Sequence, residues 1–355
     1  MVNYFSGSNS GTGFFNRFDG IVPAWESLTR YFMIKGGPGV GKSTLMKVVV
    51  KRALEQGEEA ECFYCSGDPD SLDGVRLVKR GIVFADATAP HAMDPKYPGA
   101  VEEIVSLGDF IVREKIVKYR DGIEMLTREN KRSYERAYGF LAAAAALETE
   151  RYKEVTECIN QKKLSSLADE ITETVQKIGK EYGEGEGCTV TKGESASLTE
   201  RRLFLDAISC KGCVSFAPEH FSAGSVYRVT GAYRDAVMDL LGKQVKVKKK
   251  EVFCDPLRPE LIRHMKGEGV GLTCEENTTG EMIVSEEYLK RQCHFLTKMY
   301  EKEALRMKEN AMLCLKECKK VHDELESIYR ECVDFSKVSE RTEELVSLLW
   351  PGKYA

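Results

Sequence analysis

The sequence predicts an α/β chain of two similar units, each a three-layer αβα arrangement around a mostly parallel sheet with a long helical hairpin arm. Residues 31–56 contain an apolar run, then a glycine-rich motif, then a long segment without the helix-breaking residues Gly and Pro. The same order of elements recurs in the second half, and a charged, breaker-poor segment follows each copy. We assign residues 1–186 to the first unit, with a helical insertion at about 101–180, and residues 187–355 to the second, whose arm covers about 281–350.

The composition favours a globular chain in the cytoplasm. Of 355 residues, 42% are hydrophobic and 30% charged, with a net charge of −4, so no general attraction to nucleic acid or acidic membranes is expected. The N-terminus lacks the basic and apolar regions of a signal peptide. The alanine-rich run Leu141–Leu147 is too short to span a bilayer. The basic run Lys243–Lys250 is interpreted as a solvated loop, because the rest of the chain is acidic.

The phosphate-loop motif G-x-x-x-x-G-K-[ST] is matched without exception after the apolar run Tyr31–Ile34. Glycine adopts φ > 0 without strain, so such a loop can turn its N–H groups onto phosphate, beside the positive end of the following helix. Lys42 is placed to reach the β- and γ-phosphates, and the Ser43 hydroxyl to ligate Mg²⁺. The residues expected to bind nucleotide are Gly36, Gly37, Pro38, Gly39, Val40, Gly41, Lys42, Ser43 and Thr44.

Two further strands bring acidic residues toward this loop. The run Cys62–Cys65 predicts a strand that ends in a turn containing Asp68. The next segment, Leu72–Lys79, predicts a short helix, and Gly81–Asp86 predicts a third strand. A carboxylate at this strand end, Asp86, is typical of the residue that faces Mg²⁺ through water, although turn residues are also common there.

A Pro-rich loop with His91 leaves the carboxyl end of the third strand, where ligands bind in open α/β sheets. His91 is placed to sense a γ-phosphate or to position water, and an ordinary surface histidine is equally compatible with the pattern. The candidate catalytic residues are therefore Lys42, Asp86, Asp68 and His91, with Ser43 and Asp86 as the candidate metal ligands.

The two helical segments show apolar residues at steps of three and four. Between residues 134 and 159 this stripe includes the alanine run and predicts a helical hairpin, followed by the linker Gly183–Gly187. The stretch from Glu281 to Trp350 contains no Gly or Pro and carries a coiled-coil-like stripe. We expect these arms to pack against each other, a second chain or a protein partner.

The cysteines are expected to be reduced, because the chain has no signal peptide. Two C-x-x-C pairs occur, Cys62/Cys65 and Cys210/Cys213. The pairs are far apart, and the first lies within a strand-like run. Free thiols are therefore favoured, while a structural zinc ion remains an open alternative.

The second half repeats the first with an altered loop. Gly231 follows an apolar run as Gly36 does, at an offset of 231 − 36 = 195. The next residues, Ala232–Val237, lack the glycines, the lysine and the hydroxyl that a phosphate loop requires. Asp235 places a negative charge at the start of the following helix, where it can satisfy the free N–H groups itself. We expect one nucleotide per chain, bound through Lys42.

The segment GGPGVGKST and the strand ending at Asp86 resemble the P-loop NTPase superfamily. With CSGDPDSLD, DATAPH and the weakened second copy, the wider pattern is similar to a poorly characterised family of bacterial tandem P-loop ATPases. The resemblance implies binding of ATP and Mg²⁺ with slow hydrolysis. The chain has no N-K-x-D, which disfavours GTP, and no L-S-G-G-Q, which argues against a transporter ATPase. Arg76 and Arg80 are the candidates for an arginine finger.

Three classes of function remain open at this point. The first is an ATPase that couples its nucleotide state to the helical arms or to a partner. The second is a small-molecule kinase, with the acidic loop Asp68–Asp73 and His91 forming an acceptor pocket. The third is a nucleotide-binding regulatory or scaffold protein with negligible turnover.

Overall fold

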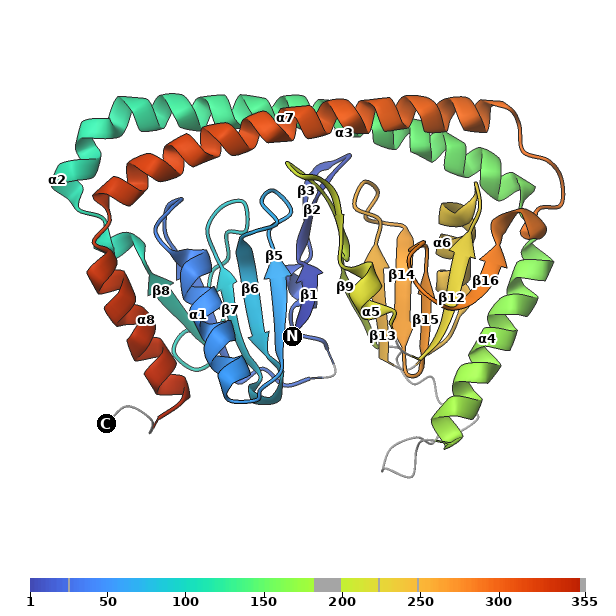
Figure 1. Cartoon of the computed structure of the whole chain (residues 1–355), viewed down its shortest axis with the longest axis horizontal. Coiled ribbons are helices and arrows are strands. Elements are labelled where there is room, and N and C mark those ends of the chain that lie inside the picture. Colours follow the sequence, from blue (N-terminus) through green and yellow to red (C-terminus); the bar gives the residue numbers. More distant parts are fainter. Residues whose placement is uncertain (25, 182–198, 223, 248, 352–355) are drawn as a thin grey trace.

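The computed structural model describes residues 1–24, 26–181, 199–222, 224–247 and 249–351. Two six-stranded sheets lie side by side, and a pair of long helices runs across the ends of both (Figure 1). The predicted linker and the predicted division between the units fall outside the described residues.

The first sheet is mixed, because one of its strands runs antiparallel to both neighbours. Its order is β1-β5-β6-β7-β4-β8, and β6 is the antiparallel strand, while the other pairs are parallel. The elements of this unit are β1 (Val2–Phe5), the hairpin β2 (Gly7–Ser10) and β3 (Gly13–Asn16), β4 (Arg30–Lys35), α1 (Lys42–Glu55), β5 (Ala60–Tyr64), β6 (Leu72–Leu77), β7 (Ile82–Asp86) and β8 (Glu102–Ser106).

The second sheet has the same strand order as the first. It runs β16-β12-β15-β14-β13-β9, with β14 antiparallel to both neighbours, which agrees with the repeat inferred from the sequence. Its elements are β9 (Thr199–Leu203), the hairpin β10 (Asp206–Ser209) and β11 (Gly212–Ser215), α5 (Ala217–His220), β12 (Ser225–Thr230), α6 (Arg234–Gln244), β13 (Lys249–Cys254), β14 (Ile262–Gly267), β15 (Val270–Thr273) and β16 (Glu281–Val284).

The helix predicted at Leu72–Lys79 is wrong, since this segment forms β6. Every residue of β6 is buried, and Gly74 lies in its middle, where it disfavours a helix. The turn from β5 to β6 is also too short for the crossover that a parallel strand would need, so the two strands pair as a hairpin. The sheet is therefore mixed rather than mostly parallel.

The long helices cover one face of each sheet rather than both, which corrects the expected three-layer arrangement, and the short helix α5 contributes Ala217 to the apolar cluster on the other face. Residues of α1 pack on the outer face of the first sheet, in a cluster with Phe32 and Phe84. The inner face of this sheet shares another apolar cluster with the second sheet, in which Phe63 and Met33 lie together with Phe253. The duplicated units therefore bury their inner faces against each other.

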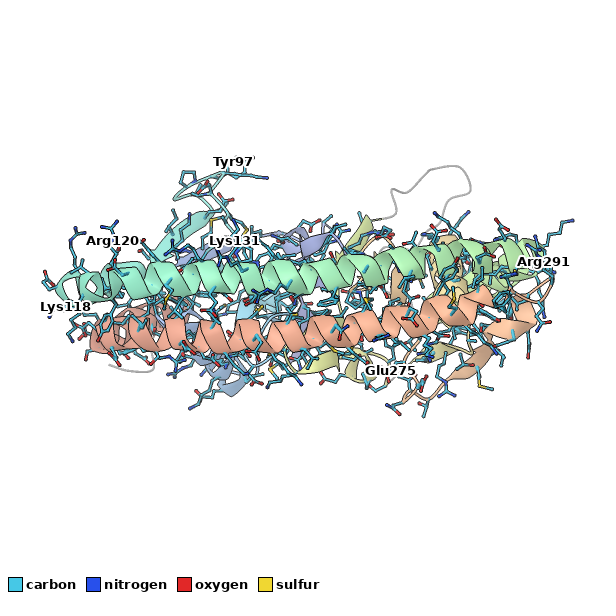
Figure 2. All side chains as sticks on the ribbon, turned by 90° about the horizontal axis from the view of Figure 1, so that it is seen from above. Tyr97, Lys118, Arg120, Lys131, Glu275 and Arg291 are labelled. Atoms are coloured by element: carbon cyan, nitrogen blue, oxygen red, sulfur yellow. The ribbon has the colours of Figure 1, made fainter. Side chains whose placement is uncertain are left out.

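The helical segments cross between the units and do not form hairpins. Helices α3 (Arg120–Cys158) and α7 (Leu296–Cys332) pack side by side over both sheets (Figure 2). After α3, α4 (Gln161–Glu181) packs in the core of the second unit, whereas α8 (Phe335–Leu349), which follows α7, packs against α1 in the first. The short helix α2 (Arg113–Ile116) precedes α3. The expectation that the arms pack against each other is therefore confirmed, within one chain.

Both predicted helical segments begin with an edge strand. Residues Glu102–Ser106 form β8 and Glu281–Val284 form β16, each parallel to the strand that leads into its unit's loop. These strands are short and carry glutamates, which hides them among charged helical sequence. Charged residues also protect an edge strand from pairing with another chain.

Candidate functional site

The predicted phosphate loop joins β4 to α1. Strand β4 ends at Lys35 and α1 begins at Lys42. Gly39 and Gly41 have φ values of 69° and 100°, a left-handed conformation that glycine adopts without strain. Gly36–Gly41 form this connection, and Lys42, Ser43 and Thr44 are the first residues of α1, so the free N–H groups at the helix N-terminus directly follow the loop.

Lys42 folds back over the loop. Its Nζ donates hydrogen bonds to the carbonyl oxygens of Gly36 and Gly37, both at 2.9 Å. The same Nζ lies 3.6 Å from Oδ2 of Asp86, and both side chains are largely buried. The ammonium group is thus surrounded by loop carbonyls and a carboxylate, which offset the cost of taking a cation partly out of water.

Asp86 ends β7, the strand next to β4, so the topology brings it beside the loop. Burial raises the pKa of Asp86 above its ordinary value, against the opposing effect of Lys42. Its Oδ1 accepts a hydrogen bond from the Thr88 backbone N–H at 2.8 Å, and the Thr88 hydroxyl donates to the Gly36 carbonyl at 3.1 Å. Lys42, Asp86 and Thr88 therefore form one connected group around the start of the loop.

Ser43 and Thr44 occupy the first turn of α1. The Ser43 hydroxyl accepts a hydrogen bond from the Leu72 backbone N–H at 3.0 Å, which leaves a second oxygen lone pair for another partner. Thr44 is exposed. Ser43 and Asp86 supply oxygen donors, the ligand type that Mg²⁺ prefers. Among the described residues, no group of three or more His, Cys, Asp or Glu side chains is arranged to hold a metal ion, so Cys210 and Cys213 form no such cluster.

His91 is buried rather than on the surface. Its ring stacks on Phe18 and meets Phe14 edge-on, at centroid distances of 4.7 and 4.9 Å. Nε2 lies 3.4 Å from Oδ2 of Asp73, while Nδ1 is buried without a partner among the described groups. Burial lowers the pKa of His91, but the hydrogen bond and charge of Asp73, with the charge of Asp86, raise it above its ordinary value overall.

Asp68 belongs to a different set of contacts from Lys42. Its Oδ2 lies 3.3 Å from Nζ of Lys319 on α7, and its Oδ1 accepts a hydrogen bond from the Asp70 backbone N–H. The turn that holds Asp68 lies beside α1, since Lys47 donates to the Asp70 carbonyl at 2.7 Å. Asp68 therefore links the turn to α7, and Asp73 is the acidic residue of this segment that the structure brings to His91.

The C-terminal end of α7 rests on the loop, a feature that the sequence analysis missed. A Cβ atom on Gly37 would lie 2.8 Å from the Tyr329 ring, and one on Gly39 would lie 2.8 Å from the Glu326 carbonyl oxygen. Val338 of α8 lies similarly close to Gly41. The absence of Gly and Pro and the apolar stripe predicted a helix in this region, but neither identified the loop as its neighbour.

The corresponding loop of the second unit is shorter than the phosphate loop, since only Gly231–Tyr233 separate β12 from α6, against Gly36–Gly41 in the first unit. Counted from the start of the helix, Arg234 and Asp235 take the positions of Lys42 and Ser43, and Arg234 forms an ion pair with Glu276. The pairing registers place Cys274 at the position of Asp86. An arginine paired to a glutamate thus replaces the lysine, and a thiol replaces the carboxylate.

An internal carboxylate binds the backbone of this second loop. Glu286 accepts a hydrogen bond from the Ala232 N–H at 2.8 Å, and the Ser285 hydroxyl accepts one from the Tyr233 N–H at 3.1 Å. Burial raises the pKa of Glu286, but the backbone hydrogen bonds keep it below its ordinary value. Asp235, the residue expected in this role, instead faces Arg263 and Arg151, at 3.7 and 3.9 Å.

The two arginine-finger candidates lie in ion pairs away from the loop. Arg76 is buried and contacts Glu61 at 2.8 Å and also Glu26. Arg80 binds Glu58 at 2.6 Å and stacks on the Trp350 ring. Both guanidinium groups are therefore held by glutamates outside the loop, and neither lies at the loop.

Comparison with known proteins gives one partial similarity. Residues 22–101 match the family model described as "Nephrocystin 3, N-terminal", a stretch that includes the loop, Asp86 and His91. No curated protein and no solved structure matches the chain. In the part of the chain that the structure describes, no helix has the length and apolarity needed to cross a membrane.

Proposed function

We propose that the first unit binds ATP with Mg²⁺ and hydrolyses it slowly, and that the nucleotide state is coupled to α7. The position of Lys42 is the observation that carries this proposal. Its ammonium lies over the loop, 2.9 Å from two loop carbonyls and 3.6 Å from Asp86. A triphosphate bound in the loop would offer this ammonium charged oxygen acceptors in place of neutral carbonyls.

Each residue of the group has a role in this proposal. The loop N–H groups and the α1 N-terminus would hold the phosphates. Ser43 would contribute its hydroxyl oxygen to Mg²⁺, and Asp86 would orient the metal's water shell. Bound Mg²⁺ would supply charge neutralisation on the phosphate oxygens. Hydrolysis forms a bond from a water oxygen to the γ-phosphorus and breaks the bond to the bridging oxygen, so ADP leaves with that electron pair and the proton of the water goes to the phosphate product.

We expect the second unit to bind no nucleotide. Glu286 lies where the first unit has Gly108, according to the strand registers, and its carboxylate already accepts a bond from the loop. A phosphate would have to displace an internal anion and would find no lysine there. One nucleotide per chain therefore remains our prediction.

A small-molecule kinase is the second candidate, and one observation favours it. His91 and Asp73 form a buried pair close enough to Asp86 and Lys42 for their charges to affect the pKa of His91. The buried Nδ1 of His91 has no partner among the described groups, as expected for an atom that binds an acceptor molecule. In this alternative the γ-phosphoryl group passes to that molecule instead of water.

The test uses purified full-length chain with Mg·ATP. Phosphate release without any added acceptor supports the ATPase, whereas ADP formation that requires a metabolite mixture supports the kinase. Binding without either product supports a regulatory role. Lys42→Ala should abolish binding or turnover, and Lys51→Ala, which removes an exposed lysine from the same helix, should not. Equal ATP affinity and turnover in wild type and Lys42→Ala would refute the nucleotide site.

A further inference from the structure

The end of α7 is held firmly against the phosphate loop. The Val112 N–H donates to the Cys332 carbonyl at 2.7 Å, and the Asp334 N–H donates to the Phe110 carbonyl at 2.9 Å. Residues 110–112 follow β8, the strand beside β4. The last turn of α7 is therefore tied to the same sheet edge that carries the loop.

Arg330 is the charged residue that this anchoring brings to the loop. A Cβ atom on Gly39 would lie 3.2 Å from Cγ of Arg330, so the aliphatic stem rests on the glycine. The Arg330 side chain is 62% exposed, and its guanidinium Nη2 lies 2.8 Å from Oε2 of Glu326. A pair between residues four apart on a helix, with the arginine exposed, contributes little to stability and opens readily.

Residues in the last turns of α7 lie directly on the glycines of the loop. Tyr329 lies on Gly37 while Arg330 lies on Gly39, so one turn of α7 spans the middle of the loop. Glu326 keeps a second contact when the arginine leaves, because Nε2 of His322 lies 3.4 Å from its other oxygen. Arg76 and Arg80, in contrast, are held elsewhere.

We propose that Arg330 leaves Glu326 and binds the γ-phosphate of ATP in the loop, as an arginine supplied by the opposite end of the same chain. This inference rests on the proposed ATPase function. Arg330 neither gives nor takes a proton in the reaction. Its guanidinium donates hydrogen bonds to γ-phosphate oxygens as the bond to the attacking water forms and the bond to ADP breaks. Arginines in this position stabilise the charge of the transition state more than that of the bound substrate.

A contact between Arg330 and the γ-phosphate would also account for the course of α7, which crosses between the units. The helix begins on the second unit, packs along α3 and ends on the first unit's loop. A contact from Arg330 to the γ-phosphate exists with ATP and is lost with ADP. The position of α7 would then report which nucleotide is bound.

The experiment compares Arg330→Ala and Arg330→Lys with Arg306→Ala, which removes an exposed arginine far along the same helix. Mg·ADP with aluminium fluoride serves as the transition-state probe. We expect Arg330→Ala to bind Mg·ADP within about two-fold of wild type, but to lose turnover by about a thousand-fold and to lose binding of the probe. Arg330→Lys should recover only part of this loss, because lysine cannot form the bidentate contact. Arg306→Ala should behave as wild type.

The outcomes separate this inference from the proposed function. If Arg330→Ala keeps wild-type turnover and probe affinity while Lys42→Ala loses ATP, the site is real and the role of Arg330 is wrong. If wild type binds no ATP, or Lys42→Ala is unaffected, the proposed function fails and the role of Arg330 fails with it. Glu326→Gln provides a second check, since releasing the arginine should preserve or increase turnover, and a loss like that of Arg330→Ala would contradict the inference.

Discussion

The contact between α7 and the loop can be tested without nucleotide by comparing two glycines. Gly39 has φ of 69° and Gly57, at the turn after α1, has φ of 70°. A Cβ atom on Gly57 would meet nothing within 4 Å, whereas one on Gly39 would lie 2.8 Å from the Glu326 carbonyl. The two positions share the same backbone strain and differ in the presence of α7.

The expected magnitudes follow from these two terms. Alanine in the left-handed region costs about 1–2 kcal/mol, which applies to both positions. Forcing an extra carbon into a packed site costs about 1–3 kcal/mol more, which applies to Gly39 alone. We therefore expect Gly57→Ala to lower the free energy of unfolding by about 1–2 kcal/mol and Gly39→Ala by about 2–5 kcal/mol, from the same two contributions.

Urea unfolding of the nucleotide-free chain, followed by circular dichroism, measures the difference. Gly139→Ala is a control with the opposite sign, because this glycine lies exposed within α3 with open space around it. The substitution should raise the free energy of unfolding by about 1 kcal/mol. Equal losses for Gly39→Ala and Gly57→Ala would mean that α7 does not rest on the loop in solution, and the role given to Arg330 would lose its basis.

Three further predictions concern the site chemistry. Asp86→Asn should reduce Mg²⁺-dependent turnover by at least about ten-fold more than it reduces nucleotide binding, because we assign Asp86 to the metal side of the site. A larger effect of Asp68→Asn would show that this carboxylate has been assigned to the wrong strand. Calorimetric titration should give one nucleotide per chain in wild type, and Glu286→Ala should not add a second; a second equivalent in wild type would show that the other loop binds. His91 has a raised pKa, so its protonated form stabilises the folded chain fully below about pH 6.5, and this stabilisation is lost as pH rises through the folded-state pKa. The stability difference between wild type and His91→Gln should therefore shrink on going to alkaline pH, and a difference that grows would contradict the assignment.

The local features of the site could be predicted from the sequence alone. A glycine loop between an apolar strand and a helix is encoded within residues 31–56, and the structure places Lys42 beside Asp86 as the motif and strand pattern predict. These features depend on backbone freedom at glycine and on hydrophobic periodicity, both of which are properties of short segments. The repeat was also visible, because its elements keep their order.

Features that depend on distant neighbours were predicted less well. The burial of β6 comes from strands on both sides, and the sequence pattern of Leu72–Leu77 does not distinguish a buried strand from a helix. The edge strands β8 and β16 were not predicted, because their glutamates make them resemble the charged helical sequence that follows. His91 could be assigned either to the surface or to the site until Phe14, Phe18 and Asp73 were known to enclose it.

The tertiary structure decided which surfaces meet. A helical stripe specifies that a helix has a buried face, but any other stripe of suitable length can cover it, so only the fold shows that α3 and α7 pair and that each continues onto the opposite unit. The second loop illustrates the same limit: its sequence shows that glycines and a lysine are missing, yet Glu286 lies far along the chain from the N–H group it binds. Sequence determined the strand, loop and helix that form the candidate site. Long-range packing determined that α7 lies over the first loop and that a carboxylate binds the backbone of the second.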